Sequence, residues 1–263
     1  MDLGLKNKVA IVAAASKGLG RAVALELAAE GAHVSICSRN RDQIHKAAEL
    51  IEAKTGAQVY CEPADVTKTE EIHAFVTNTA RRFGDIHILV TNAGGPPAGL
   101  FADLRLQEWL DAFHLNLMSV INLCSEVIPY MKKNRWGRII NVTSLSVKQP
   151  IDGAMLSNSI RAAVVGFAKT LSNELAPYNI LVNNVCPGYT STERLQELSA
   201  GIAERKGLTK DAVISTWEKS TPIGRLGRPE EFAALVAFLA SERASYITGI
   251  TVPVDGGAVK GLL

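Results

Sequence analysis

The sequence predicts a single-domain α/β protein built on a doubly wound parallel sheet of about seven strands, with helices on both faces. Short apolar runs alternate with longer, helix-periodic segments along the whole chain of 263 residues. Strands that are apolar almost throughout are typical of parallel sheets buried on both faces. A glycine-rich turn follows the first apolar run, and no linker rich in proline or serine divides the chain. These observations favour one domain that spans residues 1–263.

The individual elements follow from this alternation in chain order. The first strand is expected at 9–14, because its apolar run leads directly into the glycine-rich turn and a helix at 18–30, which a secretion signal would not do. The other apolar runs predict strands at 34–38, 58–61, 86–91, 138–143, 180–185 and 250–254. Helical periodicity between them predicts helices at 41–54, 68–83, 106–133, 157–176 and 229–240.

Residues 189–224 interrupt the alternation. This segment is polar and helix-prone, and it lies between the end of one expected strand and the last long helix. Open α/β sheets bind their ligands at the carboxyl ends of the strands, which is where this insertion begins. We therefore expect a lid over a substrate site, with a surface helix pair of no function as the alternative.

Composition excludes several classes of partner. The net charge is +2, lysine and arginine are spread along the chain, and no apolar run is long enough to span a membrane. We expect no nucleic-acid partner, no membrane partner and a cytoplasmic location. The histidines lie apart from one another, so no metal site is predicted. The cysteines form no CxxC pair and are expected as buried free thiols; they are Cys37, Cys61, Cys124 and Cys186.

The turn after the first strand is a candidate ligand site. Its sequence is Ser16-Lys17-Gly18-Leu19-Gly20, and it opens a helix. Such a turn presents backbone N–H groups and a helix N-terminus to a pyrophosphate, as in Rossmann-type dinucleotide sites. Arg39 follows the second strand, where an acidic residue would bind the ribose hydroxyls of NAD, and residues 33–41 contain no Asp or Glu. Arg39 and Lys17 therefore favour the 2′-phosphate of NADP(H) over NAD(H).

Further motifs follow in a characteristic order and spacing. They are Asp65-Val66, Asn92-Ala93-Gly94, Asn116, Gly137-Arg138-Ile139-Ile140-Asn141 before Ser144, Pro187-Gly188 with Thr190 and Thr192, Gly227-Arg228-Pro229, and Val254-Asp255-Gly256-Gly257. Together they resemble the classical short-chain dehydrogenase/reductase family from end to end. The most similar branch is that of the 3-oxoacyl-carrier-protein reductases.

The resemblance implies roles for these positions. The cofactor would be bound by the glycine-rich turn and by Asp65, Val66, Asn92, Ala93, Gly94, Pro187, Gly188, Thr190 and Thr192. Ser144 and Asn116 match two members of the family's catalytic tetrad. Family members are commonly homotetramers, so the resemblance implies a homotetramer, or a homodimer, with the helices at 106–133 and 157–176 as one interface.

The chain departs from the family pattern at two places. The glycine-rich turn has Ala13-Ala14 where the family has Thr-Gly, so the turn must accommodate a Cβ. The family's YxxxK pair falls on Ser157 and Arg161. No tyrosine occurs between Ser144 and Arg161, so a shifted alignment does not restore the pair.

The second departure removes the expected proton donor. A phenol has a pKa of about 10, whereas an aliphatic alcohol is a far weaker acid and an arginine relays protons poorly. Losing a positioned general acid typically costs about 10²- to 10⁴-fold in rate. One substitute is a water held by Ser157, with Arg161 stabilising the oxyanion. A second, ranked equal to it, is Lys148 or Asp152 as the acid. A third, ranked lower, pairs Arg161 with an anionic group of the substrate.

The candidate catalytic residues are Ser144, Asn116, Ser157 and Arg161, the last of which would also contact the cofactor. The leading hypothesis is an NADP(H)-dependent oxidoreductase for a small carbonyl or alcohol substrate, with 3-oxoacyl compounds as one class. The missing tyrosine favours an alternative, a cofactor-binding protein without turnover that acts as a sensor or an assembly partner. A non-redox enzyme on the same scaffold is a further alternative.

Overall fold

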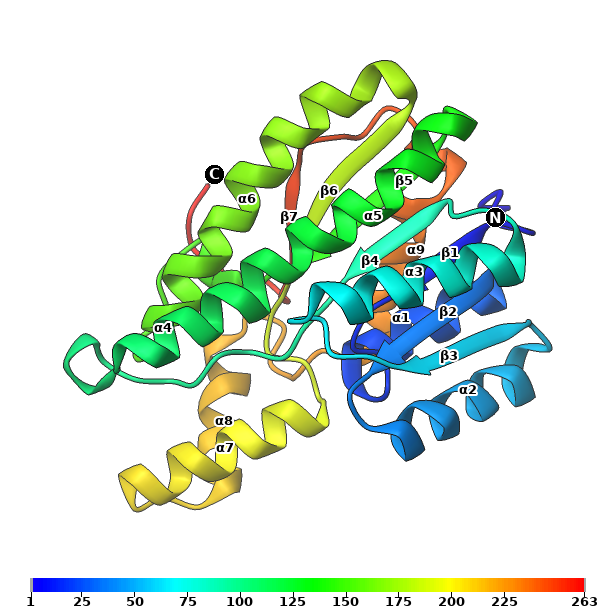
Figure 1. The fold of residues 1–263 in the computed structure, drawn as a ribbon. Coiled ribbons are helices and arrows are strands. Elements are labelled where there is room, and N and C mark those ends of the chain that lie inside the picture. Colours follow the sequence, from blue (N-terminus) through cyan, green and yellow to red (C-terminus); the bar gives the residue numbers. More distant parts are fainter. Residues whose placement is uncertain (1, 263) are drawn as a thin grey trace.

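The computed structural model describes residues 2–262, so Met1 and Leu263 of the predicted domain lie outside the described part. It contains one seven-stranded parallel sheet (Figure 1). The strands are β1 (Val9–Val12), β2 (His33–Ser38), β3 (Val59–Pro63), β4 (Ile88–Thr91), β5 (Gly137–Val142), β6 (Ile180–Pro187) and β7 (Thr251–Val254). Their order is β3-β2-β1-β4-β5-β6-β7. The order reverses between β1 and β4, at the kind of switch point where open α/β sheets bind ligands.

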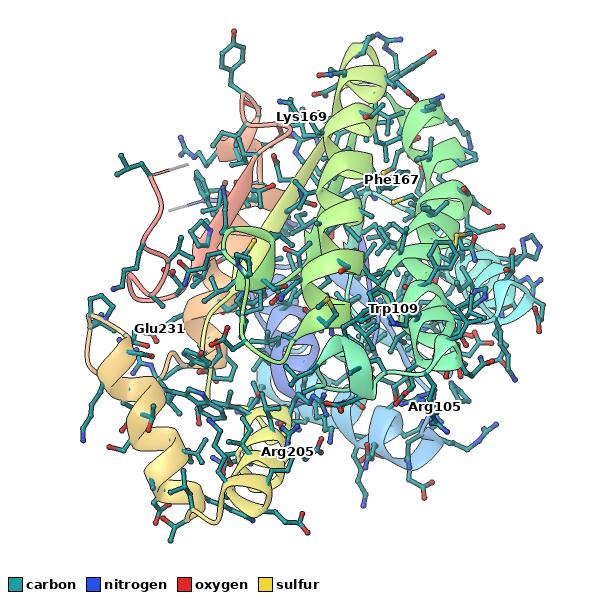
Figure 2. The ribbon with its side chains drawn as sticks, turned by 90° about the vertical axis from the view of Figure 1, so that its left-hand side faces the viewer. Arg105, Trp109, Phe167, Lys169, Arg205 and Glu231 are labelled. Carbon is teal, nitrogen blue, oxygen red and sulfur yellow. The ribbon has the colours of Figure 1, made fainter. Side chains whose placement is uncertain are left out.

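Helices cover both faces of the sheet, which confirms the doubly wound prediction. One face carries α1 (Gly18–Ala29), α2 (Arg41–Thr55) and α9 (Pro229–Ala240). The other carries α3 (Thr69–Phe83), α5 (Ser119–Asn134) and α6 (Met155–Leu175), and Figure 2 shows α5 and α6 on the side turned to the viewer. Within β1, Val12 packs into the first layer and Ile11 into the second. Both faces of the strand are buried, which explains its continuous apolar run.

The long helical region expected at 106–133 is confirmed, and it contains a π-helical turn that was not predicted. The structure has α4 (Leu106–Phe113), a π-helical turn (His114–Met118) and then α5. A π-turn adds a residue to one turn, and single π-turns are frequent at functional sites. Asn116 lies within this one. Short 3₁₀ turns lie at Phe101–Asp103, Leu145–Val147, Ala176–Tyr178 and Glu242–Ala244.

The insertion at 189–224 forms two helices, α7 (Glu193–Lys206) and α8 (Lys210–Ser220). They pack on each other around Leu195 and Trp217. The hydroxyls of Thr192 and Thr209 cap them by accepting from backbone N–H groups of the first turn. Figure 1 shows the pair beyond the end of β6, set apart from the two helical layers.

Two features of composition are visible in the fold. All four cysteines are free, and three are buried, whereas Cys61 is only half-buried because β3 is the edge strand. Burial raises the pKa of Cys37 and of Cys124 to about 12, so neither is a reactive thiolate. Within residues 2–262, no helix has the length and apolar character to cross a membrane, and no group of three or more potential metal-binding side chains occurs.

Candidate active site

A cleft of about 860 Å³ opens where β1, β2 and β4 end, at the switch point of the sheet. Most of the residues predicted to bind the cofactor line it. They are Ser16, Lys17, Gly18, Leu19, Arg39, Asp65, Val66, Asn92, Ala93, Gly94 and Thr192. Residues from four separate segments and from the insertion therefore meet in one cavity.

The glycine-rich turn is packed so closely that one glycine has no room for a side chain. A Cβ on Gly20 would lie 2.6 Å from the carbonyl oxygen of Ala14 and 2.8 Å from Nδ2 of Asn92. Asn92 donates this amide to the Ala14 carbonyl at 3.2 Å, which ties the end of β4 to the turn. Gly20 thus lies beneath the cleft surface. Ala14 has a φ of 48°, so the turn does accommodate a Cβ in the left-handed region, at a cost of about 1–2 kcal/mol.

We expect Gly20→Ala to lower the free energy of unfolding by about 1–3 kcal/mol and to weaken dinucleotide binding, because the new Cβ displaces the Ala14 carbonyl and Asn92. Gly201→Ala is the matched control, since a Cβ there has nothing within 4 Å. Alanine is also the better helix former, so this control should be as stable as the wild type or more so. Urea unfolding of both variants makes the comparison, and a Gly20→Ala protein of unchanged stability would contradict the packing argument.

The cleft has features that fit a dinucleotide with an additional phosphate. Arg39 is exposed at the cleft, and among the described residues no carboxylate forms an ion pair with it. A guanidinium in this position is suited to a phosphate. A Cβ on Gly94 would meet nothing within 4 Å, so the backbone borders open space there. Asp65 accepts hydrogen bonds from the N–H and the hydroxyl of Thr67, which fixes the loop that contributes Val66.

Two predicted catalytic residues meet at the main-chain carbonyl of Gly94, which lines this cleft. The carbonyl accepts a hydrogen bond from Nδ2 of Asn116 at 2.8 Å and one from Nη2 of Arg161 at 3.4 Å. Oδ1 of Asn116 is buried and has no hydrogen-bond partner among the described residues. The cofactor cleft and the candidate catalytic group are therefore joined through a single peptide unit.

Arg161 is a buried cation without a carboxylate partner in the described part of the chain. Its side chain is 7% exposed, and Nη1 donates to the carbonyl of Val142 at 3.1 Å. Burial lowers the pKa of Arg161 from 12.5 to about 10, so it remains charged at neutral pH. A fixed positive charge in a site with little water can stabilise an oxyanion strongly.

Three serines are linked by hydrogen bonds next to this cation. Ser157 lies one helical turn before Arg161 on α6, so both point to the same face of the helix. Its Oγ lies 3.0 Å from Oγ of Ser146, and the N–H of Ser146 donates to Oγ of Ser144 at 3.1 Å. Sequence reasoning missed Ser146, because no motif pairs it with Ser157. Only the link between Ser157 and Ser146 joins two hydroxyls, because the link to Ser144 comes from a backbone N–H, and serine hydroxyls are poor sources of a proton.

The loop after Ser144 is held in place from two sides. The side chain of Asn158 bonds the N–H and the carbonyl of Ile151 at 3.1 and 3.0 Å. Oε1 of Gln149 accepts from the N–H of Lys260 at 3.0 Å, so the C-terminal segment packs against this loop. Of the two predicted alternative acids, Lys148 is half-buried and Asp152 is exposed.

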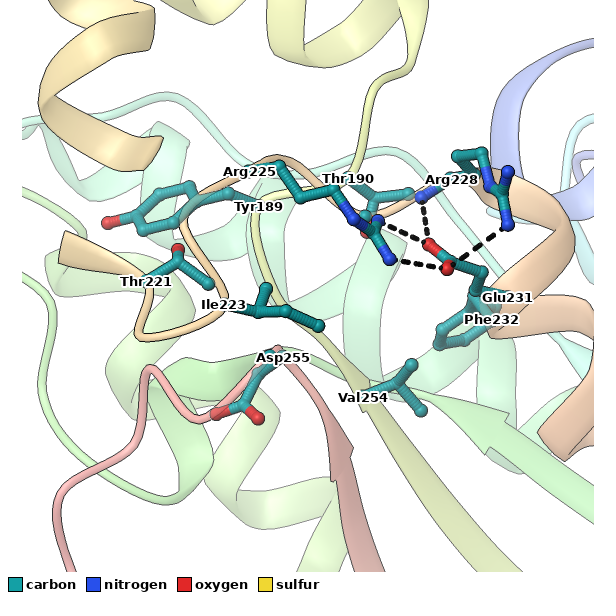
Figure 3. A pocket seen from close by; sticks show the side chains of 12 residues that line it. Tyr189, Thr190, Thr221, Ile223, Arg225, Arg228, Glu231, Phe232, Val254 and Asp255 are labelled. Atoms are coloured by element: carbon teal, nitrogen blue, oxygen red, sulfur yellow. Dashed lines mark hydrogen bonds and ion pairs between the residues drawn. The ribbon is translucent and has the colours of Figure 1, made fainter. Parts of the chain in front are cut away.

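The segment after β6 lies partly away from the cleft. The N–H of Gly188 donates to the carbonyl of Val254 at 2.9 Å, and a Cβ on Gly188 would lie 2.6 Å from Cα of Asp255. Thr190 is buried and donates its hydroxyl to the Gly188 carbonyl at 3.2 Å. It lines a separate pocket of about 190 Å³ (Figure 3). Pro187, Gly188 and Thr190 therefore do not line the cofactor cleft, whereas Thr192, at the start of α7, does.

Comparisons with known proteins agree with this geometry. A family model described as enoyl-(acyl carrier protein) reductase matches residues 13–259. A 3-oxoacyl-[acyl-carrier-protein] reductase of Chlamydia trachomatis is 36% identical over 253 residues, which are 96% of this chain and 98% of that protein. L-sorbose reductase from Gluconobacter frateurii, in complex with NADPH and L-sorbose, has a TM-score of 0.95 and 33% identity, with 100% of both chains covered.

A further similar structure is an actinorhodin polyketide ketoreductase variant with NADPH. It has a TM-score of 0.93 and 31% identity, and the match covers 97% of this chain and 98% of that chain. The family model and these relatives all span nearly the whole sequence, and the relatives are similar in both sequence and fold. This chain therefore belongs to the classical short-chain dehydrogenase/reductase family of oxidoreductases.

Proposed function

We propose that this protein is an NADP(H)-dependent oxidoreductase that interconverts a small carbonyl compound and its alcohol without a tyrosine acid. The observation that carries the proposal is the Gly94 carbonyl, which lines the cofactor cleft and binds both Asn116 and Arg161. Arg39, with no carboxylate partner in residues 2–262, supports NADP(H) over NAD(H), and two similar structures contain NADPH. The named activities of the relatives, on 3-oxoacyl groups and on a sugar ketone, support a carbonyl substrate.

Each residue of the site then has its own role in reduction of the carbonyl group. NADPH, when bound, supplies a hydride to the carbonyl carbon, and negative charge develops on the carbonyl oxygen. Ser144 accepts a hydrogen bond from the N–H of Ser146, which leaves its own O–H able to donate to that oxygen. The buried charge of Arg161 stabilises the same oxygen electrostatically, the type of contribution that is typically worth about 10²- to 10³-fold in rate. Asn116 orients the Gly94 peptide between the two parts of the site.

Protonation of the carbonyl oxygen is the step for which the chain has no ordinary donor. We propose that it comes from water and reaches the oxygen beside Ser157, whose hydroxyl is bonded to Ser146. Lys148 is the alternative source, because it is half-buried on the loop that follows Ser144, whereas Asp152 on the same loop is exposed. We rank a salt bridge between Arg161 and an anionic substrate lower, since Arg161 is 7% exposed and one N–H of each terminal nitrogen is already bonded to a main-chain carbonyl.

The insertion and the outer helices supply the remaining parts of the proposal. Tyr189 stacks on Trp217 of α8 with ring centroids 5.2 Å apart, which anchors the predicted lid over residues 189–224 to the end of β6. The predicted homotetramer or homodimer is supported by apolar side chains exposed on and near α4. They are Leu100, Phe101, Leu106 and Leu110. Figure 2 shows Trp109 of α4 and Phe167 of α6 on this side of the molecule.

The test is NADPH oxidation, followed by absorbance, with a panel of ketones, 3-oxo thioesters and keto sugars. We expect slow turnover with at least one class of carbonyl and a preference for NADPH over NADH. Tight NADPH binding with no consumption by any substrate would instead support a cofactor-binding protein without turnover. That second candidate is favoured by Ser157, whose hydroxyl is bonded to Ser146 and is too weak an acid to replace a tyrosine. Failure to bind either dinucleotide would overturn both candidates.

A further inference from the structure

Two ion pairs connect the lid to the start of α1. Nζ of Lys17 lies 3.1 Å from Oε1 of Glu197, and Nη2 of Arg21 lies 3.5 Å from Oε1 of Glu193. The cations are four residues apart at the start of α1, and the carboxylates are four residues apart on α7. Residues with this spacing share one face of a helix. The first turns of α1 and α7 therefore lie side by side and run in opposite directions.

The two pairs differ in their position relative to the cofactor cleft. Both carboxylates line the cleft, but of the two cations only Lys17 does, and Arg21 does not. Arg194 adds a second cation, with Nη1 at 3.7 Å from Oε2 of Glu197 and Nη2 at 3.5 Å from the carbonyl of Gly95. The side-chain hydrogen bond from Lys17 holds the pKa of Glu197 below its usual range, so this group is ionised. The ionised carboxylate of Glu197 is thus paired with Lys17 inside a cleft that is suited to an anionic cofactor.

Resting on the NADP(H) preference proposed above, we propose that Glu197 and the 2′-phosphate of NADP(H) compete for Lys17. Lys17 lines the same cleft as Ser38, Arg39 and Asn40, which lie at the end of β2 and directly after it and mark the expected place of that phosphate. Its ammonium is a compact charge on a flexible stem, and its side chain is 46% exposed, so it can turn from one anion to the other. NAD(H) has a hydroxyl at this position and leaves the pair of Lys17 and Glu197 intact.

The competition has a consequence for the lid. When Lys17 turns to the phosphate, α7 loses one of its two ionic contacts with the start of α1. Thermodynamic linkage makes this effect reciprocal. If NADP(H) weakens the ion pair of Lys17 and Glu197 by some factor, the ion pair lowers the affinity for NADP(H) by the same factor. Glu197 therefore lowers the affinity for NADP(H) selectively and makes the attachment of the lid depend on which dinucleotide is bound.

The first test measures affinity by titration calorimetry at low ionic strength, since exposed ion pairs are weak and screened by salt. In Glu197→Gln, the Kd for NADP⁺ should fall by about two- to fivefold, with the Kd for NAD⁺ unchanged. Glu193→Gln is the matched control, because Glu193 also lines the cleft, so the same charge is removed there, but its partner Arg21 does not line the cleft. It should leave the ratio of the two Kd values as in the wild type. An unchanged ratio in Glu197→Gln would overturn the proposal.

A Lys17→Ala background separates competition from simple repulsion between Glu197 and the phosphate. If the two anions compete for Lys17, Glu197→Gln has no effect on NADP⁺ affinity once Lys17 is absent. If the same gain persists without Lys17, the carboxylate acts by direct repulsion and the competition is refuted. These titrations require binding but no turnover, so a protein that binds NADP⁺ and reduces no carbonyl still tests the competition.

Hydrogen exchange tests the release of the lid. With saturating dinucleotide, amides in residues 195–199 should exchange faster with NADP⁺ than with NAD⁺, and the difference should disappear in Glu197→Gln. Equal or slower exchange with NADP⁺ in the wild type would show that the phosphate does not free α7, and would overturn this part of the inference.

Discussion

Restoring the family's acid pair, with Ser157→Tyr and Arg161→Lys in one chain, is expected to raise the rate of NADPH-dependent carbonyl reduction by about 10²- to 10⁴-fold. Ser157 already lies on the face of α6 that carries Arg161, and it is bonded to the loop of Ser144. A phenol at this position has a pKa of about 10 and can donate a proton directly. A neighbouring ammonium stabilises the phenolate that results. Steady-state rates with the best substrate of the panel measure the gain.

The matched control is Ser157→Phe with Arg161→Lys, which adds the ring without the hydroxyl. It should be no faster than the wild type, because it has the bulk of the tyrosine but no acid. Equal gains in the two double variants would mean that packing, and not proton donation, limits the wild type. No gain in the tyrosine variant, with an active wild type, would show that the chain already has an adequate donor, and Lys148→Ala would then identify it.

The elements that the sequence predicted well are those fixed by local rules. The inner strands are buried and mostly apolar, and the half-buried edge strands β3 and β7 still have short β-prone runs, so all seven strands could be placed within a few residues. The glycine-rich turn could be predicted because backbone donors and a helix start are needed at one place, and Arg39 because its position relative to β2 is fixed by the fold. The sequence also predicted that the turn must accommodate the Cβ of Ala14, but not the left-handed backbone of that residue.

The sequence could not predict features that depend on which distant parts of the chain pack together. The helices after β4 and β5 lie on the face of α3, and a further right-handed crossover would place α9 there as well. Instead α9 packs against α1, where Phe232 and Val236 join the core of the first face. Helical periodicity indicates that a helix has a buried side, but not which face of the sheet it covers. The π-turn around Asn116 was missed because one added residue hardly disturbs that periodicity.

In the candidate site, too, residue types could be predicted from local motifs, whereas contacts between distant residues could not. The residue types at Ser144, Asn116 and Arg161 could be read from motif spacing. Their partners could not, because Arg161 bonds main-chain carbonyls, which carry no sequence signal. The contact between Lys17 and Glu197 joins residues 180 positions apart, and only the folded insertion at 189–224 brings them together. Sequence therefore indicates which groups the chemistry needs, and packing decides what each group is bonded to before a ligand arrives.

Arg161→Gln is expected to lower kcat by about 10²- to 10³-fold, because it removes the fixed charge that we propose stabilises the developing oxyanion. The family resemblance also implies a cofactor contact for Arg161, so some loss of NADP(H) affinity is expected, but a far smaller one than the loss of kcat, since Lys17 and Arg39 remain at the other end of the cleft. The glutamine amide can still donate to the carbonyl of Val142 or Gly94. The rate is measured in the wild-type background and again with Ser157→Tyr, where the faster chemistry makes a large loss easy to quantify.

Stability distinguishes a catalytic role of Arg161 from a structural one. Burying a charge is costly, as its lowered pKa shows, so removing the charge offsets the hydrogen bond that is lost. We therefore expect the free energy of unfolding of Arg161→Gln to lie within about 1–2 kcal/mol of the wild-type value, although the variant loses most of its activity. Arg161→Lys keeps the charge and should keep most of the rate. A variant that unfolds readily would make Arg161 a structural residue, and a stable Arg161→Gln with undiminished kcat would mean that the reaction does not use its charge.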